Sequence, residues 1–498
     1  MSDPALRRWS APIATILLLG TGLLAGLRSI SPFPVANDHA YFLPPSFVAA
    51  AGGPLANPWM ASGFDQRLDW HGFLQPWLVG LGARLCGGGW DGVHLAIDGL
   101  AAAVFVAVVV VAVRIGLSTG AVITVGLTAL ALLLDARSRP EVLATAETVL
   151  LVALYAGPGA SRFASRGRAV LAGVVLGATL VTHPVVFGLA GLGLTAAAGI
   201  AVLRGELRLG AAVVVAGIAA AAAVAAVFAL THLALGIGPA DWFAGIRRAG
   251  QAVLERTDHG GFVKYQLANR FLPGAVLGFV LVGAVIVAAR RGLIEAGRVG
   301  PTAATAVAAV LAGVAGVVLY RFALRVPATY YNFSGVLVAV MLLALRLVPA
   351  AGWERRIGTA TATALAAAAV VGVGVWTVQA AGERGAIGET RGELTTALRA
   401  DLAAGRTICS DSAALAAVDD VAAARRLIVS IPLSDGPAPP DPARCEIYYR
   451  VQTQEGDASP PEVGGFRLDR DAYRRAAVVP KVRPFHLGFA RYTRDRGT

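Results

Sequence analysis

Eleven predominantly apolar stretches occupy most of the first 379 residues of this 498-residue chain. A run of about 20 apolar residues, folded as a helix, crosses the hydrocarbon core of a bilayer. Charged residues make up 15% of the chain, whereas soluble domains carry about 25%. We therefore expect an all-α polytopic membrane protein with about eleven transmembrane helices. The stretches cover residues 11–26, 93–113, 117–134, 142–157, 169–183, 185–203, 209–235, 269–289, 301–320, 333–348 and 358–379.

Charged residues are more frequent in the C-terminal segment that follows these apolar stretches. Residues 380–498 hold 17 of the 43 Lys and Arg residues and 16 of the 31 Asp and Glu residues. We expect residues 1–379 to form a transmembrane domain and residues 380–498 a small soluble α/β domain. The pattern predicts a helix over Ala386–Ala404 and strands over Arg425–Ile431 and Cys445–Gln452. A nucleic-acid-binding protein would carry its excess of basic residues in a soluble patch. This tail is nearly neutral, which argues against nucleic-acid binding.

The topology follows from the position of the arginines. Arg7 and Arg8 precede the first stretch and place the N-terminus in the cytoplasm. His71–Leu85 is short and contains a proline, so we interpret it as an interfacial amphipathic helix. If this segment were counted as a transmembrane span, every later loop would lie on the opposite side of the membrane. With eleven spans in the cell (inner or plasma) membrane, the tail lies on the extracytoplasmic side. There Cys409 and Cys445 either form a disulfide or stay as two buried thiols.

The longest loop of the body, residues 29–92, follows the first span on the extracytoplasmic face. Loops of this length in compact proteins are usually functional or disordered. Its acidic residues and histidines are Asp38, His39, Asp65, Asp69 and His71. Asp38 lies where the membrane ends, so it suits a general base and equally an N-cap for the following helix. The spacing of these residues supports no particular metal site.

Two further outer loops carry arginines, which suit a phosphate. Arg139 and Glu141 flank Pro140, which fits the first turn of the fourth span. Arg139 could bind a phosphate with Glu141 orienting it, or the two could form a membrane anchor; Glu141 could also bind an acceptor or a metal. Arg325 precedes the pair Tyr330-Tyr331 in the late loop. Within or beside the spans, Asp98, Glu147 and His183 fit either a functional or a structural role.

Three segments together resemble the GT-C superfamily of polytopic glycosyltransferases, which includes protein O-mannosyltransferases and the lipid A aminoarabinose transferase. They are Asn37-Asp38-His39-Ala40-Tyr41 with the later Asn57-Pro58-Trp59, then Asp135–Glu141, then Arg321 to Tyr331. The resemblance implies inverting transfer of a hexosyl or pentosyl group from a polyprenyl-phosphate sugar to a lipid, glycan or protein acceptor outside the membrane. It favours Asp38 as the catalytic base. It further implies that the substrate is bound by Arg139, Glu141, Arg325, His39 and Tyr330, and leaves a divalent cation open because members differ.

Other functions remain open alongside this one. A lipid-linked polysaccharide polymerase or ligase would use a late loop such as residues 236–268, which carries Arg247 and His259. A transporter would show inverted repeats, and the sequence has none that we detect. A non-catalytic scaffold protein related to these enzymes would show a similar sequence pattern. The chain lacks the Walker A, HExxH and GxSxG patterns, which argues against the enzymes that carry them.

Overall fold

The computed structural model describes about half of the chain, in two compact units. One unit comprises Met1–Leu24, Trp70–Gln75 and Gly99–Val370, and the other comprises Ala25–Asp69, Pro76–Asp98 and Val371–Thr498. The expected domain boundary at residue 379 stays a prediction. The described residues are 13–22, 24, 43–52, 73–135, 139–156, 166–203, 207–235, 240, 334–347, 392–411, 418, 423, 426–430, 444–452, 460–471 and 488–494.

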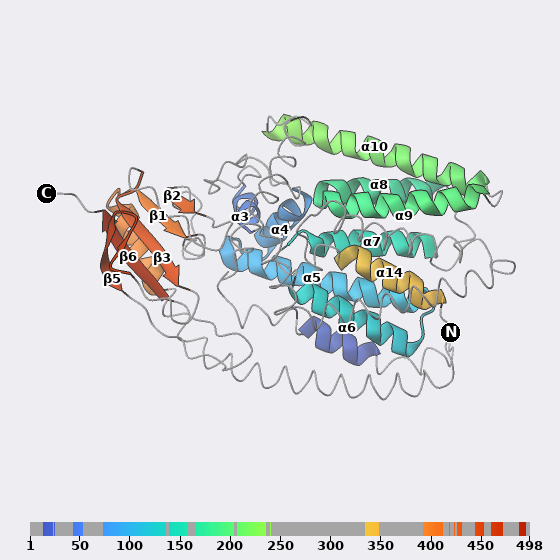
Figure 1. The fold of residues 1–498 in the computed structure, drawn as a ribbon, viewed down its shortest axis with the longest axis horizontal. Coiled ribbons are helices and arrows are strands. Elements are labelled where there is room, and N and C mark those ends of the chain that lie inside the picture. The colour runs from blue at the N-terminus through green and yellow to red at the C-terminus, as the bar shows by residue number, and fades with distance from the viewer. Residues whose placement is uncertain are drawn as a thin grey trace. The chain divides into compact units, whose positions relative to one another are not determined.

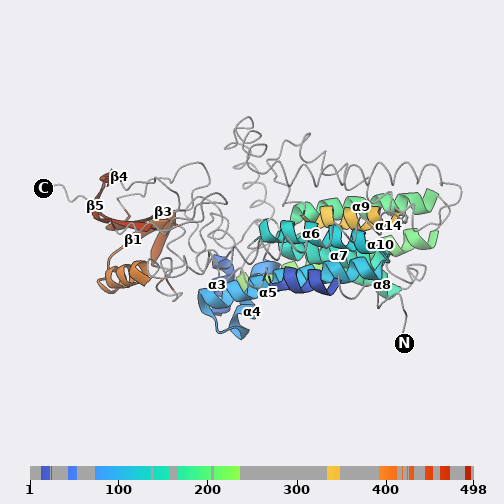
Figure 2. The ribbon, with the colours of Figure 1, turned by 90° about the horizontal axis from the view of Figure 1, so that it is seen from below.

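The first unit is a set of apolar helices that run roughly along a common direction in both views (Figures 1 and 2). Helix α7 packs against α8 and α14, and α8 packs against α9 and α10. The C-terminal part of α5 also belongs to this unit. The helices are Ile13–Gly22, α5 (Gly89–Arg114), α6 (Thr119–Asp135), α7 (Glu141–Ala156), α8 (Arg166–Thr182), α9 (Pro184–Leu203), α10 (Leu207–Leu235) and α14 (Ser334–Leu347).

These helices confirm eight of the eleven predicted stretches as helical. The stretches 269–289, 301–320 and 358–379 lie outside the described residues. Judged by length and composition, Gly89–Arg114 is the one described helix that is long and apolar enough to cross a membrane. The shorter apolar helices have 10–17 residues, for example Gly167–Thr182 and Ser334–Leu343. The eleven full-length spans therefore stay a prediction, while the helical character of eight of them is confirmed.

Glycines let α8 and α10 approach each other closely. A Cβ atom at Gly173 would clash with the carbonyl oxygen of Ala216, and one at Gly177 would lie 2.9 Å from that of Ala220. Small residues at such contacts allow two helix backbones to pack without intervening side chains. The contact of α8 with α10 is therefore specified by residues that have no side chain.

The second unit contains α3 (Pro44–Ala50), most of α4 (Leu74–Leu85) and the start of α5. Arg84 donates hydrogen bonds to the carbonyls of Ala49 and Ala50, and Phe47 stacks on Trp90 with ring centroids 4.3 Å apart. At 1.5 Å per residue, the 12 residues of α4 extend about 18 Å, well short of a bilayer core of about 30 Å. The predicted helix is confirmed over Leu74–Leu85, and its interfacial position stays a prediction.

The C-terminal part of the second unit is a mixed six-stranded sheet with the order β2-β1-β3-β6-β5-β4. β1 pairs in parallel with β2 and β3, and the remaining pairs are antiparallel. A helix over residues 392–403 precedes the sheet, so the combination of helix and strands predicted for the tail is confirmed. The strands are β1 (Ile408–Asp411), β2 (Leu427–Ser430), β3 (Ile447–Gln452), β4 (Glu462–Val463), β5 (Phe466–Asp471) and β6 (Gly488–Arg494).

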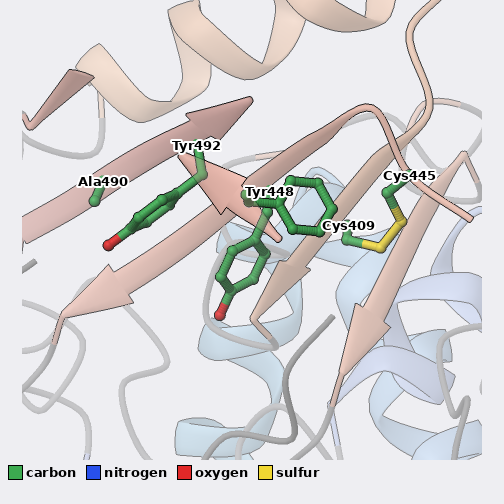
Figure 3. Packing of buried hydrophobic residues seen from close by; sticks show 6 residues of the cluster. Cys409, Cys445, Tyr448, Ala490 and Tyr492 are labelled. Carbon is green, nitrogen blue, oxygen red and sulfur yellow. A yellow bond between two sulfur atoms is a disulfide. The ribbon is translucent and has the colours of Figure 1, made fainter. Parts of the chain in front are cut away.

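A disulfide joins Cys409 and Cys445, whose Cα atoms lie 5.6 Å apart. The sequence left open a disulfide or two buried thiols, and the structure contains the disulfide. The disulfide belongs to a buried cluster with Tyr448, Phe466 and Tyr492 on one face of the sheet (Figure 3). Side chains alternate between the two faces of a strand. Tyr449 therefore lies on the opposite face, where its hydroxyl reaches Asp401 of the 392–403 helix.

Candidate functional site

Two of the six predicted site residues, Arg139 and Glu141, are described, and they lie together at the N-terminus of α7. The other four, Asp38, His39, Arg325 and Tyr330, lie outside the described residues, as do Asp65, Asp69 and His71. The late-loop residues Arg247 and His259, which a polymerase would use, lie outside them as well.

Arg139 and Glu141 form a buried ion pair. The Arg139 Nε and Glu141 Oε1 atoms are 3.1 Å apart, and the two side chains are 9% and 0% exposed. Glu141 is the first residue of α7, where a negative charge interacts favourably with the helix dipole. Breaking a buried ion pair by removing one partner is strongly destabilising, so Arg139 and Glu141 hold each other's side chains in place.

His183 approaches the same carboxylate from the junction of α8 and α9. Its Nε2 atom lies 3.5 Å from Glu141 Oε1, which is longer than an ordinary hydrogen bond. Its Nδ1 atom accepts a hydrogen bond from the backbone N–H of Val186 at 3.3 Å, in the first turn of α9. Because Nδ1 is an acceptor, a neutral His183 carries its proton on Nε2, facing Glu141. His183 thus caps α9, and its Nε2 atom lies beside the ion pair.

Polar side chains from two other helices hold the backbone around Glu141. Gln75 of α4 donates through Nε2 to the Arg139 carbonyl at 2.7 Å, and its Oε1 accepts from Leu143 N–H at 3.1 Å. Thr145 donates to the Glu141 carbonyl at 2.7 Å, and its hydroxyl lies 3.0 Å from that of Ser334 in α14. Buried polar groups are costly unless paired, so these bonds specify where Gln75, α7 and α14 meet.

A second buried acid lies further along α7. Glu147 Oε1 accepts a hydrogen bond from the Thr182 hydroxyl at 2.8 Å, one residue before His183. Among the described residues its Oε2 atom has no hydrogen-bond partner. The sequence left open a functional acid or a structural pair with a basic residue, and the partner that the described structure provides is a threonine hydroxyl.

The described residues contain no cluster of three or more His, Cys, Asp and Glu side chains that could hold a metal ion. What the site offers is one guanidinium held by a carboxylate at the start of a helix. Arginine binds phosphate groups through paired N–H donors, and helix N-termini favour anions. Recognition of a phosphate is the chemistry that this arrangement fits.

Sequence reasoning placed Arg139 and Glu141 together because they flank a proline at a span end. It did not find Gln75, Thr145 or Ser334, which are small or neutral polar residues with no motif. Their one signal is burial of a polar side chain within an apolar helix, and that is visible only after packing: Gln75 is 3% and Ser334 1% exposed.

No protein-family model matches the chain, and no curated protein matches its sequence. Two solved structures are similar to it. One is the oligosaccharyltransferase of Archaeoglobus fulgidus, in complex with Zn and sulfate, with a TM-score of 0.49 and 13% identity over 74% of this chain. The other is ArnT from Cupriavidus metallidurans, bound to undecaprenyl phosphate, with a TM-score of 0.49 and 15% identity over 84% of this chain and 76% of that chain. Both are GT-C membrane glycosyltransferases, the superfamily that the sequence resembles. The chain spans about half of the oligosaccharyltransferase, covering 52% of its length.

Proposed function

We propose that this chain is a membrane glycosyltransferase that moves a sugar from a polyprenyl-phosphate donor to a lipid, glycan or protein acceptor on the extracytoplasmic face. The observation that carries the proposal is the buried Arg139–Glu141 pair at the N-terminus of α7. A buried arginine held in one orientation beside apolar helices suits a lipid phosphate. The arginine can bind the phosphate group, and the apolar helices can contact the lipid tail.

In this reaction the acceptor hydroxyl oxygen bonds to the anomeric carbon as the bond between that carbon and the phosphate oxygen breaks. The electron pair of the broken bond stays on the polyprenyl phosphate, and Arg139 stabilises the charge that develops there. Asp38 takes the proton of the acceptor hydroxyl as general base. Glu141 orients Arg139, and His39, Arg325 and Tyr330 contact the substrate. Apart from the pair itself, these roles rest on the sequence.

The disulfide between Cys409 and Cys445 supports the proposed topology, since structural disulfides form in oxidising compartments. The C-terminal domain would then be extracytoplasmic, on the same side as loop 29–92. We propose a multi-pass protein of the cell or inner membrane with a cytoplasmic N-terminus.

Binding of the lipid phosphate tests the role of Arg139. The purified full chain in nanodiscs is titrated with undecaprenyl phosphate, the lipid that ArnT holds. We expect Arg139→Gln to weaken binding by about tenfold or more, because hydrogen bonds to charged groups contribute about 1.5–3 kcal/mol. Arg139→Lys keeps the charge and loses the planar guanidinium, so its affinity for the lipid should lie between those of the wild type and Arg139→Gln. Arg114→Gln, an exposed residue in the last turn of α5, is the matched control.

Transfer itself tests Asp38. Membranes that contain the full chain are incubated with radiolabelled hexosyl and pentosyl polyprenyl phosphates, and label leaving the lipid is counted. Asp38→Asn should abolish transfer and leave binding of undecaprenyl phosphate unchanged. Transfer that survives Asp38→Asn but is lost in His259→Ala would favour a polymerase or ligase. Unchanged phosphate binding in Arg139→Gln would refute the proposed site.

A further inference from the structure

Gln75, at the start of α4, bonds to the backbone on both sides of Glu141 in the segment that carries the proposed phosphate ligand. It is 64 residues from Arg139 and 68 from Leu143 in the sequence, yet its single amide bonds to the backbone of both. The side chain is buried, with 3% exposure. The amide thus uses its donor on one side of Glu141 and its acceptor on the other.

The start of α7 needs such a partner. The first four N–H groups of a helix have no carbonyl acceptor within it, and a Ser, Thr, Asp or Asn side chain next to them usually supplies one. The two residues that precede α7 are Arg139 and Pro140, and neither offers a side-chain acceptor. Leu143 is the third residue of α7, so Gln75 Oε1 occupies the place of the missing cap.

The other half of the amide determines where Arg139 lies. The Arg139 carbonyl accepts from Gln75 Nε2 at 2.7 Å and from Val142 N–H at 3.2 Å. Its guanidinium is directed by Glu141 through Nε. Gln75 therefore holds the backbone of Arg139, and Glu141 holds its side chain.

We propose that Gln75 is a positioning residue, which holds Arg139 in place for the lipid phosphate and so makes phosphate recognition depend on the first outer loop. The inference rests on the proposed function. Gln75 belongs by sequence to loop 29–92, the loop that carries Asp38. The residue that positions the phosphate ligand and the proposed base are in this way assigned to one continuous segment of the chain.

A double-mutant cycle on binding of undecaprenyl phosphate tests the inference. The full chain in nanodiscs is titrated as wild type, Gln75→Met, Arg139→Gln and the double variant. Gln75→Met should weaken binding by roughly tenfold, less than the roughly hundredfold that a small misplacement of a reacting group can cost. The double variant should bind no more weakly than Arg139→Gln alone, because Gln75 acts only through Arg139.

Thermal unfolding of the same four proteins separates positioning from stability. Gln75→Met should lower the unfolding temperature by a similar amount in both backgrounds, so stability changes add while binding changes do not. Gln75→Glu is the second variant: it keeps the acceptor for Leu143 and loses the donor to the Arg139 carbonyl, so it should fold and still bind the lipid phosphate more weakly.

The outcomes distinguish the two proposals. Wild-type affinity in Gln75→Met or Gln75→Glu, with Arg139→Gln impaired, would overturn the positioning role and leave the proposed function intact. Losses that multiply in the double variant would also overturn it, since Gln75 would then act independently of Arg139. Wild-type affinity in Arg139→Gln would overturn the proposed function, and the role of Gln75 with it.

Discussion

Substitution of Asp401 by asparagine should strongly destabilise the C-terminal domain. Asp401 lies on the 392–403 helix, and 6% of it is exposed. Arg491 of β6 donates to both of its oxygens, from Nε and Nη2, each at 2.8 Å. The Tyr449 hydroxyl of β3 donates to Oδ2 at 2.6 Å. One carboxylate therefore ties the helix to two neighbouring strands.

The magnitude follows from these contacts. Removing one partner of a fully buried pair costs about 3–5 kcal/mol. Here Arg491 is 15% exposed and keeps a second partner, Asp469, so we expect about 2–4 kcal/mol for Asp401→Asn. Tyr449→Phe removes one hydrogen bond to a charged acceptor and should cost about 1.5 kcal/mol. Asp469→Asn is the control, since its side chain is 45% exposed and such pairs contribute about 0–1 kcal/mol.

Pulse proteolysis of the full chain in detergent, at increasing urea, measures the free energy of unfolding of this domain. The fragment is followed through a tag at the C-terminus. The order of destabilisation should be Asp401→Asn, then Tyr449→Phe, then Asp469→Asn. If Asp401→Asn shifts the urea midpoint no more than Asp469→Asn, the carboxylate does not hold the helix to the sheet and the reasoning fails.

The same cluster predicts a pH dependence. Burial by itself would raise the pKa of Asp401, but hydrogen bonds from Arg491 and Tyr449 outweigh burial and lower it below its usual 3.8. A folded pKa below the unfolded one stabilises the domain above pH 3.8, and this contribution is lost as the pH falls through the folded value. Burial and Asp401 also raise the pKa of the Tyr449 hydroxyl, so it stays a donor at neutral pH. Repeating the urea series in acid should show a fall in wild-type stability that Asp401→Asn lacks.

Two further predictions concern packing and the disulfide. Gly173→Val should lower the thermal midpoint of the full chain, because its Cβ would meet the Ala216 carbonyl, whereas Gly217→Ala faces open space and should not; equal midpoints would contradict the close α8–α10 contact. Thiol labelling of the denatured, unreduced chain should find one free cysteine, Cys86, and not three. Replacing Cys409 and Cys445 by serine should cost the domain about 4 kcal/mol, since the bridge closes a 36-residue separation.

Much of the secondary structure was predictable because it depends on local composition. The eight confirmed helices follow from apolar runs, and β2 and β3 from short β-branched and aromatic runs next to loops. The order of the sheet was not predictable in this way: β6 lies between β3 and β5, and pairing of that kind depends on contacts between segments distant in sequence.

The candidate site divides along the same line. Arg139 and Glu141 were predicted together because a proline between them at a span end fixes two neighbouring side chains. His183 was left between two roles, and the structure places it beside Glu141 because α8 packs on α7. Gln75 and Ser334 were missed because neither belongs to a motif and both come from other helices.

The sequence by itself determined that the chain forms apolar helices followed by a small α/β domain, and that an arginine and a glutamate meet at the start of one helix. Those features depend on residues within a few positions of one another. Only the tertiary structure decided which polar groups complete that site, because they come from α4, from the α8–α9 junction and from α14. Their partners are chosen by the burial of polar atoms and by close helix contacts such as Gly335 against Thr148, and no local pattern encodes either.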